Sequence, residues 1–167
     1  MITTEVRPFI ITRTFNAPRK MMWSLWTEQQ HMSKWFGPKG ATIGKFDLDL
    51  RVGGMFHYML QMEGMQMWGK AVYKEIVPPE KIVWINSFSD AEGGITRHPL
   101  TTDPWPLELL TEVTFEEADG KTTIRIEWTP VNATDAEVEF FNLSHASMQQ
   151  GWTGTFDRLE VYLPGLH

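Results

Sequence analysis

Histidine is the residue type in this chain best suited to acid–base chemistry, because its side chain titrates near neutral pH. It is also the main candidate metal ligand, since the sequence contains no cysteine. The histidines are His31, His57, His98, His145 and His167. None of them form the His-Glu-x-x-His pattern or another close ligand spacing of a metal site. No serine lies in a Gly-x-Ser-x-Gly turn, and the segment 37–40 is too short for a phosphate-binding loop. The sequence therefore predicts no metal site and no cofactor, and it leaves His57, His98 and His145 as candidates for an acid or base.

A second group of side chains has the composition of a small-molecule pocket, with large apolar walls and a few polar tips. These candidate ligand-binding residues are Tyr58, Trp84, Asn86, Trp105, Trp128, His145, Met148 and Trp152. The alternative is a filled core in which the polar tips hydrogen-bond to one another. For His145 alone, a structural role is the simpler interpretation. Trp105 would either close over a ligand or anchor its loop.

The elements that must position these side chains include strands between residues 42 and 129, where apolar residues recur with a period of two. With a first strand at Phe9–Phe15, the strands run at about 43–48, 54–61, 67–77, 81–88, 108–116 and 122–129. Asp119-Gly120 is the strongest hairpin signal. The loop between Ser89 and Leu107 is unusually long and contains three prolines. Such loops are often lids or binding loops.

The sequence does not decide which face of the strand at Met55–Met62 is buried, because apolar residues occur at both its odd-numbered and its even-numbered positions. We expect Phe56 and Tyr58 to point inward, but a shift of one residue would replace them with His57 and Met59. A strand of this kind also suggests that its outer face is covered, either by the long loop or by a second subunit. The methionines around this hairpin could form a flexible mouth to a cavity or could fill gaps.

Helices are expected at both ends of the chain. Two short helices should follow the first strand, with Asn16 as the first cap and Thr27 opening a capping box for the second. A long C-terminal helix should run from the capping box at 134–137 to Pro164. Its apolar stripe is Phe141, His145, Met148, Trp152, Phe156, Leu159 and Leu163. Gly151 and Gly154 predict a slight break or a close approach to the sheet.

Together these elements predict an α+β fold in which a curved antiparallel sheet of about seven strands wraps around the long helix, with two short helices after the first strand. Several motifs are spread along almost the whole chain. They are Phe15-Asn16-Ala17-Pro18 with Trp23, Trp35-Phe36-Gly37-Pro38, the segments 49–54 and 77–83, Gln150-Gly151-Trp152, Leu159 and Tyr162-Leu163. In these motifs the chain resembles the START-like, or SRPBCC, helix-grip superfamily. The branch is that of the carboxy-terminal domain of the activator of the ninety-kilodalton heat-shock protein ATPase. The resemblance implies a cavity between sheet and helix, but superfamily members differ widely in function.

Composition limits the classes of function. The 167 residues are 42% hydrophobic, which fits one domain over 1–167. Acidic residues outnumber basic ones by 21 to 15 and there is no basic run, so a nucleic-acid partner is not expected. No segment is apolar enough to span a membrane, and the first residues do not have the pattern of a signal peptide, which predicts a cytoplasmic location.

The leading hypothesis is therefore a module that binds a small, mainly apolar or aromatic molecule between the sheet and the C-terminal helix. One alternative is an enzyme of the cyclase or hydrolase type that uses a cavity histidine. The resemblance suggests another, a chaperone partner acting through its outer surface. A homodimer is compatible with all three hypotheses.

Overall fold

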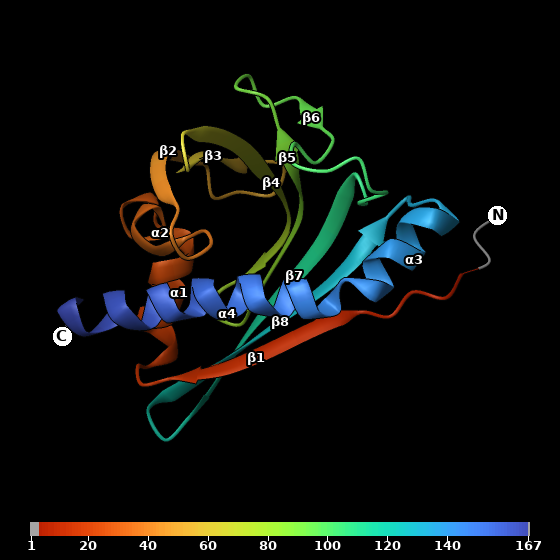
Figure 1. Cartoon of the computed structure of the whole chain (residues 1–167). Coiled ribbons are helices and arrows are strands. Elements are labelled where there is room, and N and C mark those ends of the chain that lie inside the picture. The colour runs from red at the N-terminus through yellow and green to blue at the C-terminus, as the bar shows by residue number, and fades with distance from the viewer. Residues whose placement is uncertain (1–3, 167) are drawn as a thin grey trace.

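The computed structural model describes residues 4–166 and contains a curved antiparallel sheet with a helix lying across its concave side (Figure 1). The strands are β1 (Phe9–Phe15), β2 (Thr42–Leu48), β3 (Met55–Met62), β4 (Met65–Val77), β5 (Lys81–Ser89), β6 (Ile95–Thr96), β7 (Glu108–Ala118) and β8 (Lys121–Val131). The helices are α1 (Arg19–Thr27), α2 (Gln29–Trp35), α3 (Asp135–Leu143), α4 (His145–Tyr162) and the short 3₁₀ helix η1 (Leu163–Leu166). The predicted fold class is confirmed.

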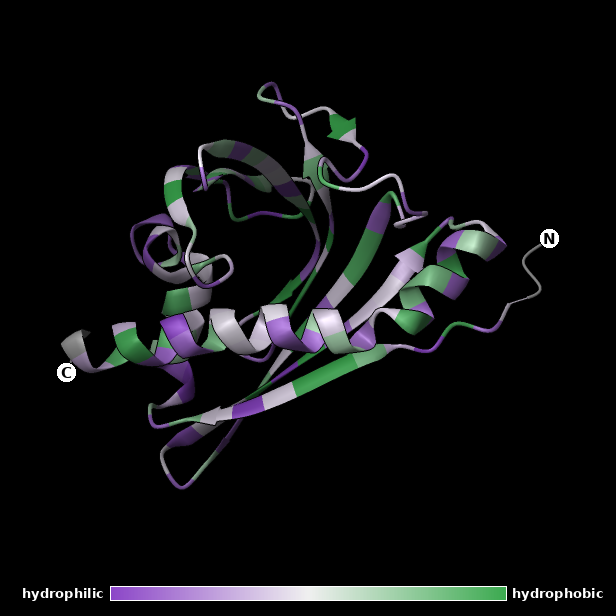
Figure 2. Cartoon of the chain, viewed as in Figure 1, coloured by the Kyte–Doolittle hydropathy of each residue, from purple (hydrophilic) through white to green (hydrophobic). Residues whose placement is uncertain are grey.

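The strand order in the sheet is β1-β8-β7-β5-β4-β3-β2, and the two-residue β6 pairs with β5. Each predicted strand agrees with the observed one to within two residues, whereas β6 was not predicted. The turn at Asp119-Gly120 joins β7 to β8 with positive φ at both residues, as the hairpin signal requires. Figure 2 shows hydrophobic and hydrophilic residues alternating along the strands, the pattern of a sheet with one buried face.

The structure resolves the ambiguity of β3. Phe56 is almost fully buried on the concave face, and Tyr58 packs against the same core. His57 lies on the convex face, where its ring stacks on Trp68 with 5.1 Å between the ring centroids. Its Nε2 atom lies 3.1 Å from Ser89 Oγ, so the beginning of the long loop contacts the outer face of β3.

Two of the predicted helix caps are wrong and one is confirmed. The N-cap of α1 is Pro18, which leaves Asn16 too far before the helix for its side chain to reach the first N–H groups. The hydroxyl of Thr27 donates instead to the carbonyl of Trp23 at 2.7 Å, and α2 has no side-chain cap. At α3 the capping box is complete, because Thr134 Oγ1 accepts from the N–H of Glu137 and the Glu137 carboxylate accepts from the N–H of Thr134.

The C-terminal helix is not continuous, and its break is not at the glycines. Ser144 separates α3 from α4 and caps both helices, with φ of −101° and ψ of 8°. The Ser144 hydroxyl donates to the carbonyl of Phe140 at 2.7 Å, a local bond that competes with the helical pattern. Gly151 and Gly154 both lie inside α4, and Gly154 approaches Lys39, which belongs to the α2–β2 connection rather than to the sheet.

An aromatic cluster fills the space between α1, α2, the sheet and α4. Trp26 is fully buried and its ring lies 4.7 Å from that of Trp35, 6.4 Å from that of Trp84 and 6.2 Å from that of Trp152. Burial of such rings is a major source of stability. The cluster fills one end of the concave side, so any cavity must lie toward the other. Within residues 4–166, no helix has the length and hydropathy needed to cross a membrane.

Candidate functional site

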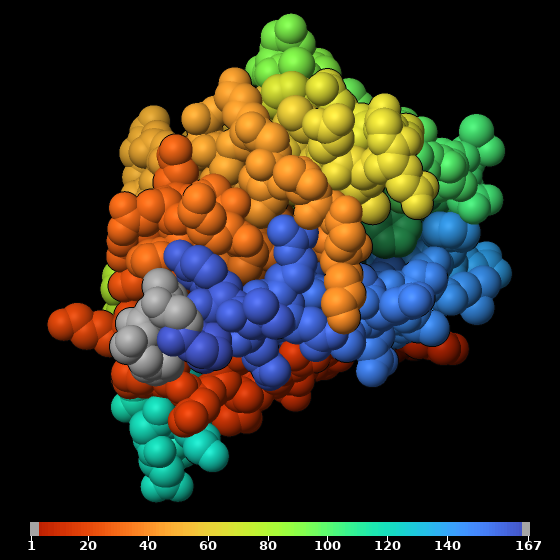
Figure 3. All heavy atoms as spheres, turned by 60° about the vertical axis from the view of Figure 1, so that its left-hand side comes forward, coloured from red at the N-terminus to blue at the C-terminus, as the bar shows by residue number. Residues whose placement is uncertain are grey.

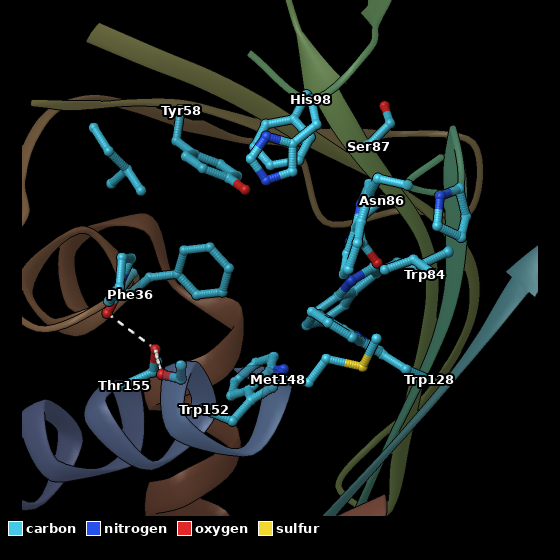
Figure 4. A pocket seen from close by; sticks show the side chains of 18 of the residues that line it. Phe36, Tyr58, Trp84, Asn86, Ser87, His98, Trp128, Met148, Trp152 and Thr155 are labelled. Atoms are coloured by element: carbon cyan, nitrogen blue, oxygen red, sulfur yellow. Dashed lines mark hydrogen bonds between the residues drawn. The ribbon is translucent and has the colours of Figure 1, made fainter. Parts of the chain in front are cut away.

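A cavity of about 350 Å³ lies between α4 and the concave face of the sheet (Figure 4). This volume falls within the usual size range of small-molecule sites. Its walls come from the connection after α2, from β3, β5, β7, β8 and α4, and from the loop after β6. The predicted residues that line it are Tyr58, Trp84, Asn86, Trp105, Trp128, Met148 and Trp152. The interior is therefore not completely filled by side chains.

His145 is the one predicted residue that does not line the cavity. It is the first residue of α4, and its Nε2 atom lies 2.9 Å from the carbonyl oxygen of Arg7. Its ring packs edge-on against Phe9 and Phe141. The helical stripe placed His145 beside Met148 and Trp152, but at the start of α4 the side chain turns toward the N-terminal segment.

Tyr58 supplies a hydroxyl at one end of the cavity. In the antiparallel register it is paired with Gly69 of β4, and its ring occupies the space that a Cβ atom on Gly69 would need. Glycine at this position lets the ring lie across the neighbouring strand. Burial raises the pKa of Tyr58 to about 12, so the hydroxyl stays protonated at neutral pH.

Asn86 supplies an amide group from β5. The hydroxyl of Thr111, which is fully buried on β7, donates to Asn86 Oδ1 at 2.6 Å. This bond orients the amide and leaves its NH₂ group as the available donor. The indole N–H of Trp128 is also buried and has no hydrogen-bond partner among residues 4–166.

His98 comes from the loop after β6 and lies at the same end of the pocket as Tyr58, opposite Trp152 and Met148 (Figure 4). Its ring centroid is 4.5 Å from that of Phe88 and 5.9 Å from that of Trp105. Burial lowers the pKa of His98, which favours the neutral imidazole. Its Nδ1 atom accepts the N–H of Leu100 at 3.1 Å, so the proton of the neutral ring is on Nε2.

An ion pair attaches this loop to α3. Arg97 Nη1 lies 2.6 Å from Glu137 Oε2, and the other oxygen of Glu137 belongs to the capping box of α3. Partial burial by itself would raise the pKa of Glu137, but the bonds from the Thr134 N–H and the Arg97 guanidinium together lower it. The carboxylate therefore links the loop to the start of α3.

The connection after α2 forms a further wall. The ring of Phe36 lies 5.2 Å from those of Phe56 and Tyr58. α4 holds this connection, because Thr155 Oγ1 donates to the carbonyl of Gly37 at 3.0 Å and Arg158 Nη1 donates to that of Pro38 at 2.8 Å.

Sequence reasoning missed several lining residues, notably Phe36, Ser147 and Gly151, and it considered His98 only as an acid or base. In the sequence the Phe36-Gly37-Pro38 segment has glycine and proline, which end the second short helix, and no periodicity indicates where such a connection packs. None of the residues that line the cavity is charged. Within residues 4–166 no group of three His, Asp or Glu side chains is arranged to hold a metal ion.

Two further hollows are larger but more polar than this cavity. One of about 570 Å³ lies between the N-terminal segment and α3, and one of about 780 Å³ lies against residues 97–105. The second shares His98 and Trp105 with the apolar cavity, so these two side chains form part of the partition between them.

Comparison with known proteins gives a family and a fold. The profile described as "Activator of Hsp90 ATPase homolog 1-like protein" (AHSA1) matches residues 16–164. A Mycobacterium smegmatis crystal structure is 22% identical with a TM-score of 0.73 and 96% coverage of both chains. A Staphylococcus epidermidis structure is 23% identical with a TM-score of 0.72, covering 99% of this chain and 94% of that one. The AHSA1 protein of Silicibacter pomeroyi is 15% identical with a TM-score of 0.73, covering 96% and 100% respectively. The sequence matches no curated protein.

Proposed function

The chain belongs to the AHSA1 family of activator of Hsp90 ATPase homolog 1-like proteins, and from that premise we propose that it binds a small, uncharged, mainly apolar or aromatic molecule between the sheet and α4. The observation that carries this proposal is the cavity of about 350 Å³, whose lining is aromatic and aliphatic apart from a few polar groups. Apolar walls supply affinity by burying ligand surface, and a few polar groups orient the ligand.

The polar groups of the cavity are mainly hydrogen-bond donors. The NH₂ group of Asn86, the Nε2–H group of His98 and the protonated hydroxyl of Tyr58 all belong to its lining. The preferred ligand therefore carries a neutral acceptor, such as a carbonyl or ether oxygen. A charged ligand would lose its hydration without gaining an ionic partner.

The state of His98 favours binding over base catalysis. A general base needs a free lone pair facing the proton that it removes. In the neutral His98 ring the Nδ1 lone pair is used by the N–H of Leu100, and Nε2 carries the proton. The other two candidates lie outside the cavity. His145 is bound to the Arg7 carbonyl, and His57 lies on the convex face of the sheet. The alternative of an enzyme that uses a cavity histidine thus has weaker support than a binding module.

The experiment that tests the proposal is a heteronuclear NMR titration with methyl naphthoate, followed through the tryptophan indole N–H resonances. Of the eight tryptophans, Trp84, Trp105, Trp128 and Trp152 line the cavity. We expect saturable shifts in those four signals, because the naphthyl ring current acts only on nearby nuclei.

The chain provides internal controls for this titration. Trp23 of α1 packs on Phe115 of β7, and Trp68 stacks on His57 on the convex face. Their signals should stay unchanged. Shifts confined to Trp23 or Trp68 would place the probe outside the cavity, and no saturable shift in any signal would refute the proposal for this class of molecule.

Three further predictions from the sequence also remain open. Sedimentation would test for a homodimer, cell fractionation would test for a cytoplasmic location, and co-purification would test for a chaperone partner at the outer surface. The last alternative would gain support if the cavity bound nothing while the convex face did.

A further inference from the structure

We infer that Gly151 forms part of the mouth of the cavity and that its missing side chain keeps this mouth wide enough for an elongated molecule to enter, an inference that rests on the proposed function. Of the residues that line the cavity, all within the described part of the chain, only Ser147 and Gly151 are exposed to solvent. They are one turn apart on α4 and so lie on the same face of the helix. The cavity therefore opens to solvent beside this turn of α4.

The glycine at position 151 has no explanation in the packing of the protein itself. It lies in the interior of α4, where glycine is the least favourable residue after proline. Apart from its chain neighbours and the nearby backbone of α4, a Cβ atom added to it would meet no atom of the described residues within 4 Å. At Gly154, by contrast, an added Cβ would lie 3.3 Å from Lys39 Cβ and 3.4 Å from Lys39 N. The space beside Gly151 is open, and it is part of the lining of the cavity.

The surroundings define the opening. On one side, Thr155 and Arg158 hold the Gly37-Pro38 turn against the same helix. In Figure 3 a recess with dark green atoms at its base opens between blue α4 atoms and the orange and yellow atoms above them. Because Gly151 lines the cavity and has open space beside it, a branched side chain at position 151 would extend from α4 into that space. The missing side chain therefore gives an elongated apolar molecule room to pass the helix backbone.

The test compares Gly151→Leu and Gly151→Ala with the wild type, using the fluorescence of N-phenylnaphthylamine, an uncharged probe with two aromatic groups. We expect Gly151→Leu to weaken binding about tenfold or more and to slow association in stopped-flow mixing, with a smaller effect for Gly151→Ala. Both variants should unfold at the same temperature as the wild type or higher, because alanine and leucine favour helices more than glycine does.

The matched control is Gln150→Leu, which adds the same side chain one residue earlier. Gln150 is exposed and does not line the cavity, so its variant should bind the probe as the wild type does. Wild-type affinity and association rate in Gly151→Leu would overturn the inference while leaving the proposed function intact. Failure of the wild type itself to bind the probe would overturn both. If Gly151→Leu were unfolded, an unchanged Gly151→Ala would still contradict the inference.

Discussion

The contact between Tyr58 and Gly69 predicts that Gly69→Ala destabilises the protein by about 1–3 kcal/mol, the usual cost of adding a methyl group to filled space. The three atoms nearest to an added Cβ are the Oη, Cζ and Cε2 atoms of Tyr58, all closer than van der Waals contact allows. The whole ring would therefore have to leave its position over β4.

Once the Tyr58 ring is removed, Gly69→Ala should stabilise the protein instead of destabilising it. Alanine inside a strand is more stable than glycine by about 0.5–1 kcal/mol. Gly69→Ala should then stabilise a Tyr58→Ala protein by that amount. The coupling energy between the two positions becomes about 1.5–4 kcal/mol, well above the value for independent sites.

Urea unfolding of the four proteins, followed by circular dichroism, measures this coupling. Tyr58→Phe is the matched control. Because Cζ and Cε2 also occupy the space beside Gly69, loss of the hydroxyl alone should leave Gly69→Ala destabilising. Coupling below about 0.5 kcal/mol in the Tyr58→Ala cycle would refute the reasoning.

Three other predictions concern the loop and the cavity. Burial lowers the pKa of His98 in the folded protein, so as pH falls the unfolded chain takes up a proton at this residue first. The free energy of unfolding of the wild type should therefore decrease below pH 6.5. The same pH dependence of the free energy of unfolding in wild type and His98→Gln would contradict this. Thr134→Ala should cost about 1 kcal/mol by removing the cap of α3. Arg97→Met should cost less, because the Arg97 side chain is 66% exposed, and the reverse order in urea unfolding would contradict this ranking. In NMR titrations naphthoate should bind about tenfold or more weakly than methyl naphthoate, because the cavity lining has no cation; equal affinities would be the opposing result.

Strand alternation was enough to predict most of the concave face. Phe56 and Tyr58 are predicted to point inward, and Trp84 and Trp128 to line a pocket, because period-two patterns indicate a side of the sheet directly. The pattern of β3 alone could not decide between Tyr58 and His57. Cross-strand contacts decide it, namely the packing of the Tyr58 ring over Gly69 and of the His57 ring on Trp68.

The errors have two causes, a local side-chain bond in one case and distant contacts in the others. The break at Ser144 is marked by a serine that donates to Phe140 O, whereas the more conspicuous Gly151 remains helical. The position of His145 was extrapolated along a stripe that the break interrupts. Phe36 and His98 reach the cavity from connections whose paths depend on tertiary bonds, such as Thr155 to Gly37 and Arg97 to Glu137.

The two attachments of the cavity walls also have a mechanical consequence. Thr155 and Arg158 bind the Gly37-Pro38 turn to α4 through two hydrogen bonds, so that turn and the helix should fluctuate as one cooperative unit with similar rates of amide hydrogen exchange. The 97–107 segment is joined to α3 through an ion pair with a mostly exposed arginine and through the packing of Trp105 on Phe140, and we expect its amide hydrogens to exchange faster than those of the Gly37-Pro38 turn. We therefore expect the wall formed by residues 97–107 to move more readily than the wall at Gly37-Pro38, so that differently shaped ligands of the proposed class would be accommodated mainly by that segment.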